Sequence, residues 1–144
     1  MIMISACLMG KNCKYNGGNN LRREIAEMPG EKLEFCPECL GGLRIPHDPS
    51  EIEEGFSGED VLDGKARVLS KNGADVTDEF IRGAKKTLAI AQANNIQKVY
   101  FKQSSPSCGC GLIYDGTFSG VKKHGYGVTA ALLRRNGIEV TGIE

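Results

Sequence analysis

Six cysteines are the residues best suited to chemistry in this chain of 144 residues. Three of them, Cys7, Cys36 and Cys108, fall at or just past the end of a short segment that we predict to be a β-strand. The carboxyl ends of parallel strands meet at one edge of a sheet, and open α/β sheets bind ligands at that edge. We therefore expect these three thiols to converge on one site.

Spacing alone leaves three kinds of thiol site open. The CxxC pattern of redox sites, which is also half of a zinc knuckle, occurs at residues 36–39. A redox motif of this kind should begin a helix, and we expect Gly41 and Gly42 to disrupt that helix. The CGC at 108–110 argues against zinc, because its cysteines are spaced too tightly for a usual zinc knuckle. Thiolates from three separate loops suit an iron–sulfur cluster better than a zinc knuckle or a redox pair. One iron would then keep an open position and act as a Lewis acid.

Polar residues beside these cysteines are candidates for catalysis. Ser105 and Ser107 precede Cys108, and Glu38 lies two residues after Cys36. Taken alone, the serines belong to an ordinary turn and Glu38 is a solvated acid. Their position next to the cysteines makes them candidate site residues, with Glu38 as the general acid or base.

The elements that position these residues alternate between strands and helices. We predict strands over Ile2–Ser5, Lys32–Cys36, Val99–Phe101 and Ile138–Thr141, and helices over Leu21–Met28, Val76–Asn94 and Gly127–Arg135. This order predicts a single α/β domain over residues 1–144, with a small, mostly parallel, Rossmann-like sheet flanked by helices. We expect a long surface loop over Leu43–Gly58, with one helical turn near Ser50, and small β-structure over Val61–Leu69.

Composition narrows the class of protein. The 18 basic and 18 acidic side chains cancel, which argues against a protein that coats duplex nucleic acid. No basic leader or apolar segment of about 20 residues is present, so we expect a cytoplasmic protein whose cysteines bind metal or do thiol chemistry. The acidic segment 48–60 and five basic residues are expected to border the cleft: Lys11, Lys14, Arg44, Lys122 and Lys123.

Several motifs, in order along the chain, resemble the microbial thiouracil desulfidase family. They are SACL (5–8), CKYNG (13–17), CPE (36–38), LGGL (40–43), SPSCG (105–109), IYDGTFSG (113–120) and GVTAALL (127–133). The resemblance implies a [4Fe–4S] cluster held by Cys7, Cys36 and Cys108. It also implies that the cluster takes sulfur from a thiolated pyrimidine without net redox change. Such a cluster is expected to be lost from protein prepared in air.

The same resemblance implies roles for other residues and a class of substrate. Cys13 matches a family position and is a candidate further ligand, whereas Cys39 and Cys110 fall where the family varies. Ser105 or Ser107 would hydrogen-bond the pyrimidine or the attacking water. Longer relatives carry a further domain and act on tRNA. Since this chain ends at Glu144, we expect 4-thiouracil or its nucleoside or nucleotide as substrate, with tRNA less favoured.

Two alternatives stand beside this interpretation. One is a non-catalytic binding module that is stabilised by zinc or by a cluster. The other is a thiol oxidoreductase that uses the CxxC pair Cys36 and Cys39.

Overall fold

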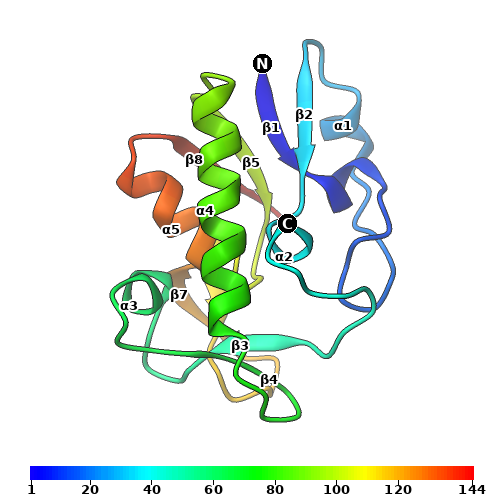
Figure 1. The fold of residues 1–144 in the computed structure, drawn as a ribbon. Coiled ribbons are helices and arrows are strands. Elements are labelled where there is room, and N and C mark those ends of the chain that lie inside the picture. The colour runs from blue at the N-terminus through cyan, green and yellow to red at the C-terminus, as the bar shows by residue number, and fades with distance from the viewer.

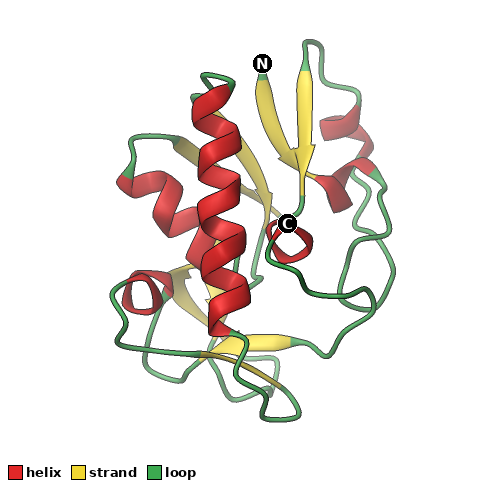
Figure 2. Cartoon of the chain, viewed as in Figure 1, coloured by secondary structure: helices red, strands yellow, loops and turns green.

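The centre of the molecule is a four-stranded parallel sheet, seen in a computed structural model that describes residues 1–144 (Figures 1 and 2). Its strands, in spatial order, are β2 (Lys32–Phe35), β1 (Ile2–Ser5), β5 (Lys98–Lys102) and β8 (Glu139–Ile143). Side chains of β1 alternate between the two faces, and both Met3 and Ile4 are fully buried. Helices must therefore cover both faces of the sheet, as is usual for parallel sheets.

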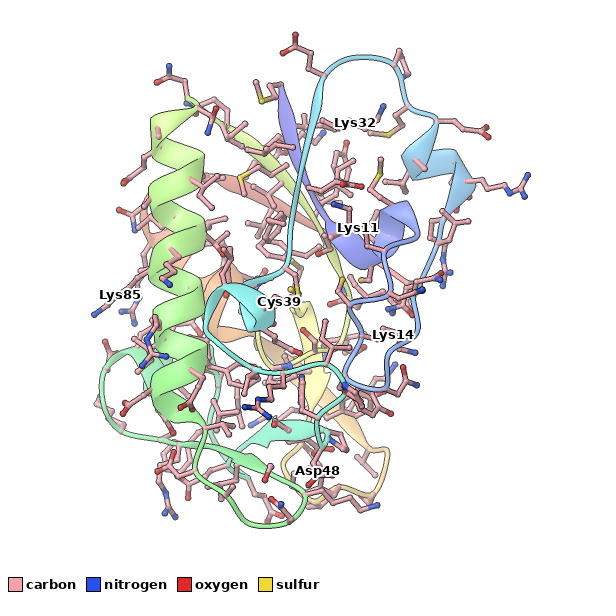
Figure 3. All side chains as sticks on the ribbon, turned by 45° about the vertical axis from the view of Figure 1, so that its right-hand side comes forward. Lys11, Lys14, Lys32, Cys39, Asp48 and Lys85 are labelled. Carbon is pink, nitrogen blue, oxygen red and sulfur yellow. The ribbon has the colours of Figure 1, made fainter.

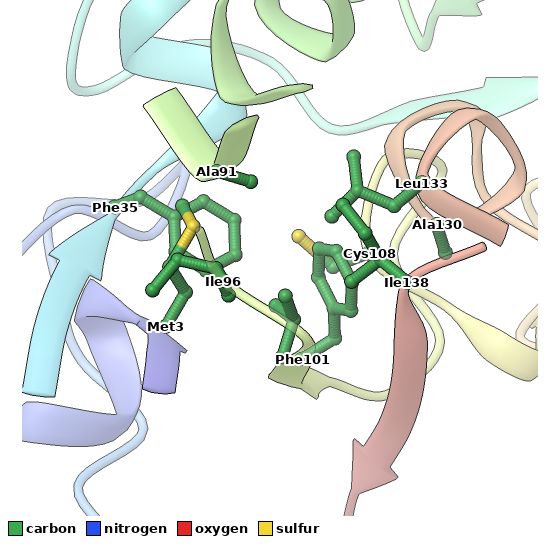
Figure 4. Packing of buried hydrophobic residues seen from close by; sticks show 10 residues of the cluster. Met3, Phe35, Ala91, Ile96, Phe101, Cys108, Ala130, Leu133 and Ile138 are labelled. Atoms are coloured by element: carbon green, nitrogen blue, oxygen red, sulfur yellow. The ribbon is translucent and has the colours of Figure 1, made fainter. Parts of the chain in front are cut away.

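One face carries the two longest helices, α4 (Thr77–Ala93) and α5 (Val128–Arg135), drawn in green and orange in Figure 1. Met3, Phe101 and Leu133 belong to the core between these helices and the sheet, and Phe35 meets Phe101 edge to face at 5.4 Å between ring centroids. Figure 4 shows Cys108 within this same cluster. The core therefore fixes the segment after β5 that carries Cys108.

The other face is covered by smaller elements. The 3₁₀ helix η1 (Ala6–Met9) and the one-turn helix α1 (Arg23–Ala26) bury Leu8 and Ile25 against Ile4. The helix α2 (Pro37–Leu40) follows β2 directly and packs against α4, on the side of the two long helices.

A second region lies beyond the sheet and is made of two antiparallel strand pairs. These are β3 (Ser50–Ile52) with β4 (Val68–Ser70), and β6 (Cys110–Tyr114) with β7 (Lys122–Tyr126), accompanied by the helix α3 (Gly58–Leu62). Ile52, Val68 and Ile113 from these pairs share a core with Phe80 and Val128 of the long helices. This core attaches the second region to the sheet domain.

The predicted α/β class, the parallel sheet and the two long helices are confirmed. No helix in the structure is long and apolar enough to span a membrane.

Four local predictions are wrong. The expected loop at 43–58 contains the buried strand β3 in place of a helical turn, because pairing with β4 buries residues that carry no apolar pattern. Segment 61–69 starts within α3, and only its last two residues form a strand. The helix expected over 21–28 is a single turn, since Arg22 is extended and no side chain caps the helix. Gly41 and Gly42 do not prevent a helix after Cys36; α2 forms and ends there.

Candidate active site

A cavity of about 410 Å³ opens at the carboxyl edge of the parallel sheet, within the range of small-molecule sites. Cys7, Cys36 and Cys108 all line it. Cys7 follows β1, Cys36 follows β2, and Cys108 lies in the segment after β5. A fourth thiol, Cys13, reaches the same cavity from the loop after η1. The structure thus gathers residues that are more than a hundred positions apart in the chain.

Close contact between two helices sets the position of Cys36. Cys36 is the N-cap of α2, and α2 packs on α4 through Gly41 and Gly83. A Cβ on Gly83 would lie 2.0 Å from the carbonyl oxygen of Pro37, and one on Gly41 would lie 2.0 Å from that of Glu79. Only glycine permits this approach, so the pair determines where α2 places its site residues.

The thiol of Cys13 lies between two of the other thiols. Its hydrogen bonds are the main reason why the pKa of Cys7 falls to about 7 and that of Cys36 to about 6. The pKa of Cys13 itself is raised, first by its interaction with Cys36 and then by that with Cys7. Cys7 and Cys36 therefore carry much of the thiolate character of the site near neutral pH, and the thiolate is the form that binds metal.

Cys108 has different surroundings. It is 7% exposed, and burial raises its pKa well above the ordinary value. Its Sγ lies 3.4 Å from the hydroxyl of Ser107 and 3.9 Å from that of Ser5. The Ser5 hydroxyl donates to this buried sulfur and would stabilise negative charge on it once a cationic group binds.

The candidate catalytic residues form one hydrogen-bonded chain along the cavity. The hydroxyls of Ser105 and Ser107 are 3.3 Å apart, and Ser107 donates to Oε1 of Glu38 over 3.4 Å. Ser105 also accepts the backbone N–H of Cys108 at 2.7 Å, which fixes its rotamer. All three residues line the cavity.

The row of hydrogen bonds continues from Glu38 to His47, a residue that the sequence analysis did not single out. Nδ1 of His47 lies 2.7 Å from the carbonyl oxygen of Asp48 and therefore donates to it, while Nε2 lies 3.2 Å from Oε2 of Glu38. A proton must lie between Nε2 and the carboxylate, and the contact with Glu38 raises the pKa of His47. Glu38 thus shares a proton with a neighbour inside the cavity. No sequence motif marked His47, since it lies in the segment expected to be a surface loop.

Comparison with known proteins decides the family. The sequence pattern of a family described as 2-thiouracil desulfurase matches residues 2–144. The chain belongs to the 2-thiouracil desulfurase family. It is 49% identical over 142 residues to the uncharacterized protein YbbK of Bacillus subtilis (strain 168), covering 97% of this chain and 93% of that protein. Among solved structures it is similar to the [4Fe–4S]-dependent thiouracil desulfidase TudS, with 41% identity and a TM-score of 0.83 over 98% of this chain and 89% of that one.

The donors in this chain suit a cluster better than a single metal ion. No group of three or more His, Cys, Asp or Glu side chains could hold one metal ion. The ligands of a cluster bind different iron atoms and need not converge on one point, and thiolates are the usual ligands. Cys7, Cys36 and Cys108, on separate elements around one cavity, fit that requirement.

The remaining two cysteines lie away from the cavity. Cys39 is exposed on α2 (Figure 3), and Cys110 packs against the core, where burial raises its pKa to about 12. Neither lines the cavity.

Lysines supply positive charge at the cavity. Of the five basic residues expected there, Lys14 and Lys122 line it, whereas Lys11 instead pairs with Glu34 at 2.9 Å. The expectation was wrong for Arg44 and Lys123, which do not line it. Two lysines not foreseen, Lys71 and Lys102, do so.

Nor does the acidic segment 48–60 surround the cavity, because Glu51 is its only acidic residue in the lining. Glu53 pairs with Arg67, and Asp60 caps α3.

Proposed function

We propose that this chain is a [4Fe–4S]-dependent desulfidase that removes sulfur from a thiolated pyrimidine and releases it as sulfide. The convergence of Cys7, Cys36 and Cys108 on a cavity that also holds the Ser105–Ser107–Glu38 chain carries the proposal. Membership of the 2-thiouracil desulfurase family supports it.

In this proposal Cys7, Cys36 and Cys108 hold the cluster. A cluster with three protein ligands supplies one open iron, a Lewis acid that can hold the thiocarbonyl sulfur and polarise the attached carbon. Cys13, whose thiol contacts Cys7 and Cys36, supports two of the ligands and is the candidate to replace one of them.

Glu38 moves the protons. The reaction replaces C=S by C=O, consumes one water and yields hydrogen sulfide, with no net electron transfer. Glu38 accepts a proton from the attacking water and passes one to the departing sulfur. Ser107 donates to one oxygen of Glu38, and His47 faces the other. The two contacts hold the carboxylate in one orientation, toward the cavity that the cysteines line.

The substrate is proposed to be 4-thiouracil, its nucleoside or its nucleotide. A cavity of about 410 Å³ suits a molecule of this size, and the lysines lining it favour a substrate with one phosphate. We expect higher kcat/KM with these small molecules than with thiolated tRNA. Salt dependence should be weak, because few phosphate contacts give a shallow slope of affinity against salt.

The test is sulfide release by protein reconstituted without oxygen. With 4-thiouracil, 4-thiouridine or its monophosphate, sulfide and the desulfurated pyrimidine should form in equal amounts. Protein with an intact cluster that releases no sulfide from any of the three would refute the proposal. A preference for intact tRNA of about tenfold or more, lost steeply on adding salt, would refute its substrate class.

A second candidate is a thiol oxidoreductase that uses Cys36 and Cys39. The CxxC pair follows a strand and begins a helix, and the pKa of Cys36 is lowered to about 6, as in redox-active pairs. Thiol–disulfide exchange that survives Cys7→Ala and Cys108→Ala would favour this candidate over the first.

A further inference from the structure

Part of the cavity wall comes from the second region of the molecule, away from the thiols. Ser50 and Glu51 of β3 line it, together with Phe118 and Gly120 from the turn between β6 and β7. The proton-transfer chain described above uses none of these side chains.

Glu51 holds the turn in place. Although it is a carboxylate, Glu51 is only 8% exposed. Its Oε1 accepts the backbone N–H of Gly116 at 2.9 Å and that of Phe118 at 3.2 Å. Backbone donors to a buried carboxylate make strong hydrogen bonds, so the turn is bound to β3 at two successive points.

The turn is packed tightly around these bonds. A Cβ on Gly116 would lie 2.5 Å from the backbone nitrogen of Glu54, so the turn lies directly against the chain after β3. Phe118 has a φ of 56°, a left-handed conformation that is uncommon for a bulky residue and persists where neighbours impose it. The bond from its N–H to Glu51 is one of the contacts that hold this conformation.

Phe118 is the one aromatic residue of the lining without an aromatic or cationic partner. Phe35 packs edge to face on Phe101, and Tyr15 lies 6.4 Å from His47 between ring centroids. The ring of Tyr114 has the Nζ of Lys122 over it at 5.5 Å. Phe118 has no such contact, so its ring is free to stack on a ligand in the cavity it lines.

We propose that the planar ring of the substrate stacks on the side chain of Phe118. Glu51 is a positioning residue that holds Phe118 at the cavity wall. The assignment rests on the proposed function only for the identity of the ring, a pyrimidine.

Equilibrium binding of uracil to cluster-containing protein under anaerobic conditions tests the proposal without turnover. Stacking of a base on an aromatic side chain is worth about 1–3 kcal/mol, so Phe118→Ala should weaken uracil binding about tenfold. Phe118→Leu keeps apolar bulk without a π face and should lose nearly as much, whereas Phe118→Tyr should bind as the wild type does. Dihydrouracil, whose ring is not aromatic, should bind the wild type about as weakly as uracil binds Phe118→Ala.

Glu51 is tested by a double-mutant cycle. Glu51→Ala should weaken uracil binding about as much as Phe118→Ala, and the double variant no further, because Glu51 acts through Phe118. Glu51→Gln, which keeps the accepting oxygen, should restore binding. In desulfuration the losses should fall on KM, with kcat within about twofold.

Several results would overturn the inference. These are unaltered uracil binding in both Phe118→Ala and Phe118→Leu, equal affinity for uracil and dihydrouracil, or failure of the wild type to bind uracil at millimolar concentration. Additive losses in the double variant would overturn the role of Glu51. Stacking-dependent binding without sulfide release would instead refute the proposed function and leave this assignment standing.

Discussion

The cavity is built from two regions that are held in different ways. On one side, Cys7, Cys36 and Cys108 follow strands of the parallel sheet. On the other, Glu51 lies on β3 and Phe118 in the turn between β6 and β7, and a hydrogen bond joins the two residues. Our two proposals assign different tasks to these regions: the chemistry to residues that follow the strands of the parallel sheet, and the recognition of the ring to a turn that Glu51 holds against β3.

Loss of a thiol on the sheet side should have the largest effect. We expect Cys7→Ala, Cys36→Ala and Cys108→Ala each to abolish both the cluster and sulfide release, because each removes a thiolate ligand. The cluster is followed by its broad absorption near about 400 nm, and turnover by sulfide. The matched controls, Cys39→Ala and Cys110→Ala, remove thiols that do not line the cavity. If they were equally destructive, the assignment of three ligands would be wrong.

Removing the charge of Glu38 should separate catalysis from cluster binding. Glu38→Gln is nearly isosteric but cannot take up a proton, so kcat should fall by about 10²–10⁴ while the absorption of the cluster persists. Glu24→Gln, at an exposed site on α1, is the control. Turnover of Glu38→Gln within threefold of the wild type would exclude Glu38 as the acid or base.

The contact between α2 and α4 gives a test of the rigid scaffold. Gly83→Ala places a methyl group against the carbonyl of Pro37, at 2.0 Å if nothing moves. Because α2 must then shift, we expect a loss of stability of about 1–3 kcal/mol and weaker cluster retention, measured by urea unfolding and by iron content. Lys85→Ala, on the same helix but at an exposed position (Figure 3), should change neither. Full stability in Gly83→Ala would show that the two helices can separate freely.

Charge at the cavity mouth should have the smallest effect. Lys14→Gln and Lys71→Gln should each lower kcat/KM for the nucleoside monophosphate about fivefold, as expected for loss of about 1 kcal/mol from a partly solvated ion pair. Values for the uncharged base should not change, and Lys86→Gln on α4 should change neither. Equal losses with base and nucleotide would mean that these lysines do not contact a phosphate.

The sequence predicted the sheet side of the cavity well. Short apolar segments mark β1, β2, β5 and β8, and Cys7, Cys36 and Cys108 follow the first three of these strands, as the geometry of a parallel sheet leads one to expect. Glu38, Ser105 and Ser107 were singled out because they lie within two or three residues of a cysteine, and all three line the cavity.

The side of the cavity formed by β3 and the turn between β6 and β7 could not be predicted from local sequence patterns. β7 is Lys122-Lys123-His124-Gly125-Tyr126, which has no apolar alternation, and β3 has only three residues. Glu51 and Phe118 are 67 positions apart, and His47 gains its role only where Glu38 meets it. Such contacts depend on tertiary packing, which local patterns do not encode.

Iron and sulfide analysis of protein purified without oxygen tests the central claim most directly. A cluster held by Cys7, Cys36 and Cys108 should give a brown protein with about four iron atoms and four labile sulfides per chain. A colourless protein that holds one zinc ion per chain and no labile sulfide would contradict the account and favour a zinc-stabilised binding module.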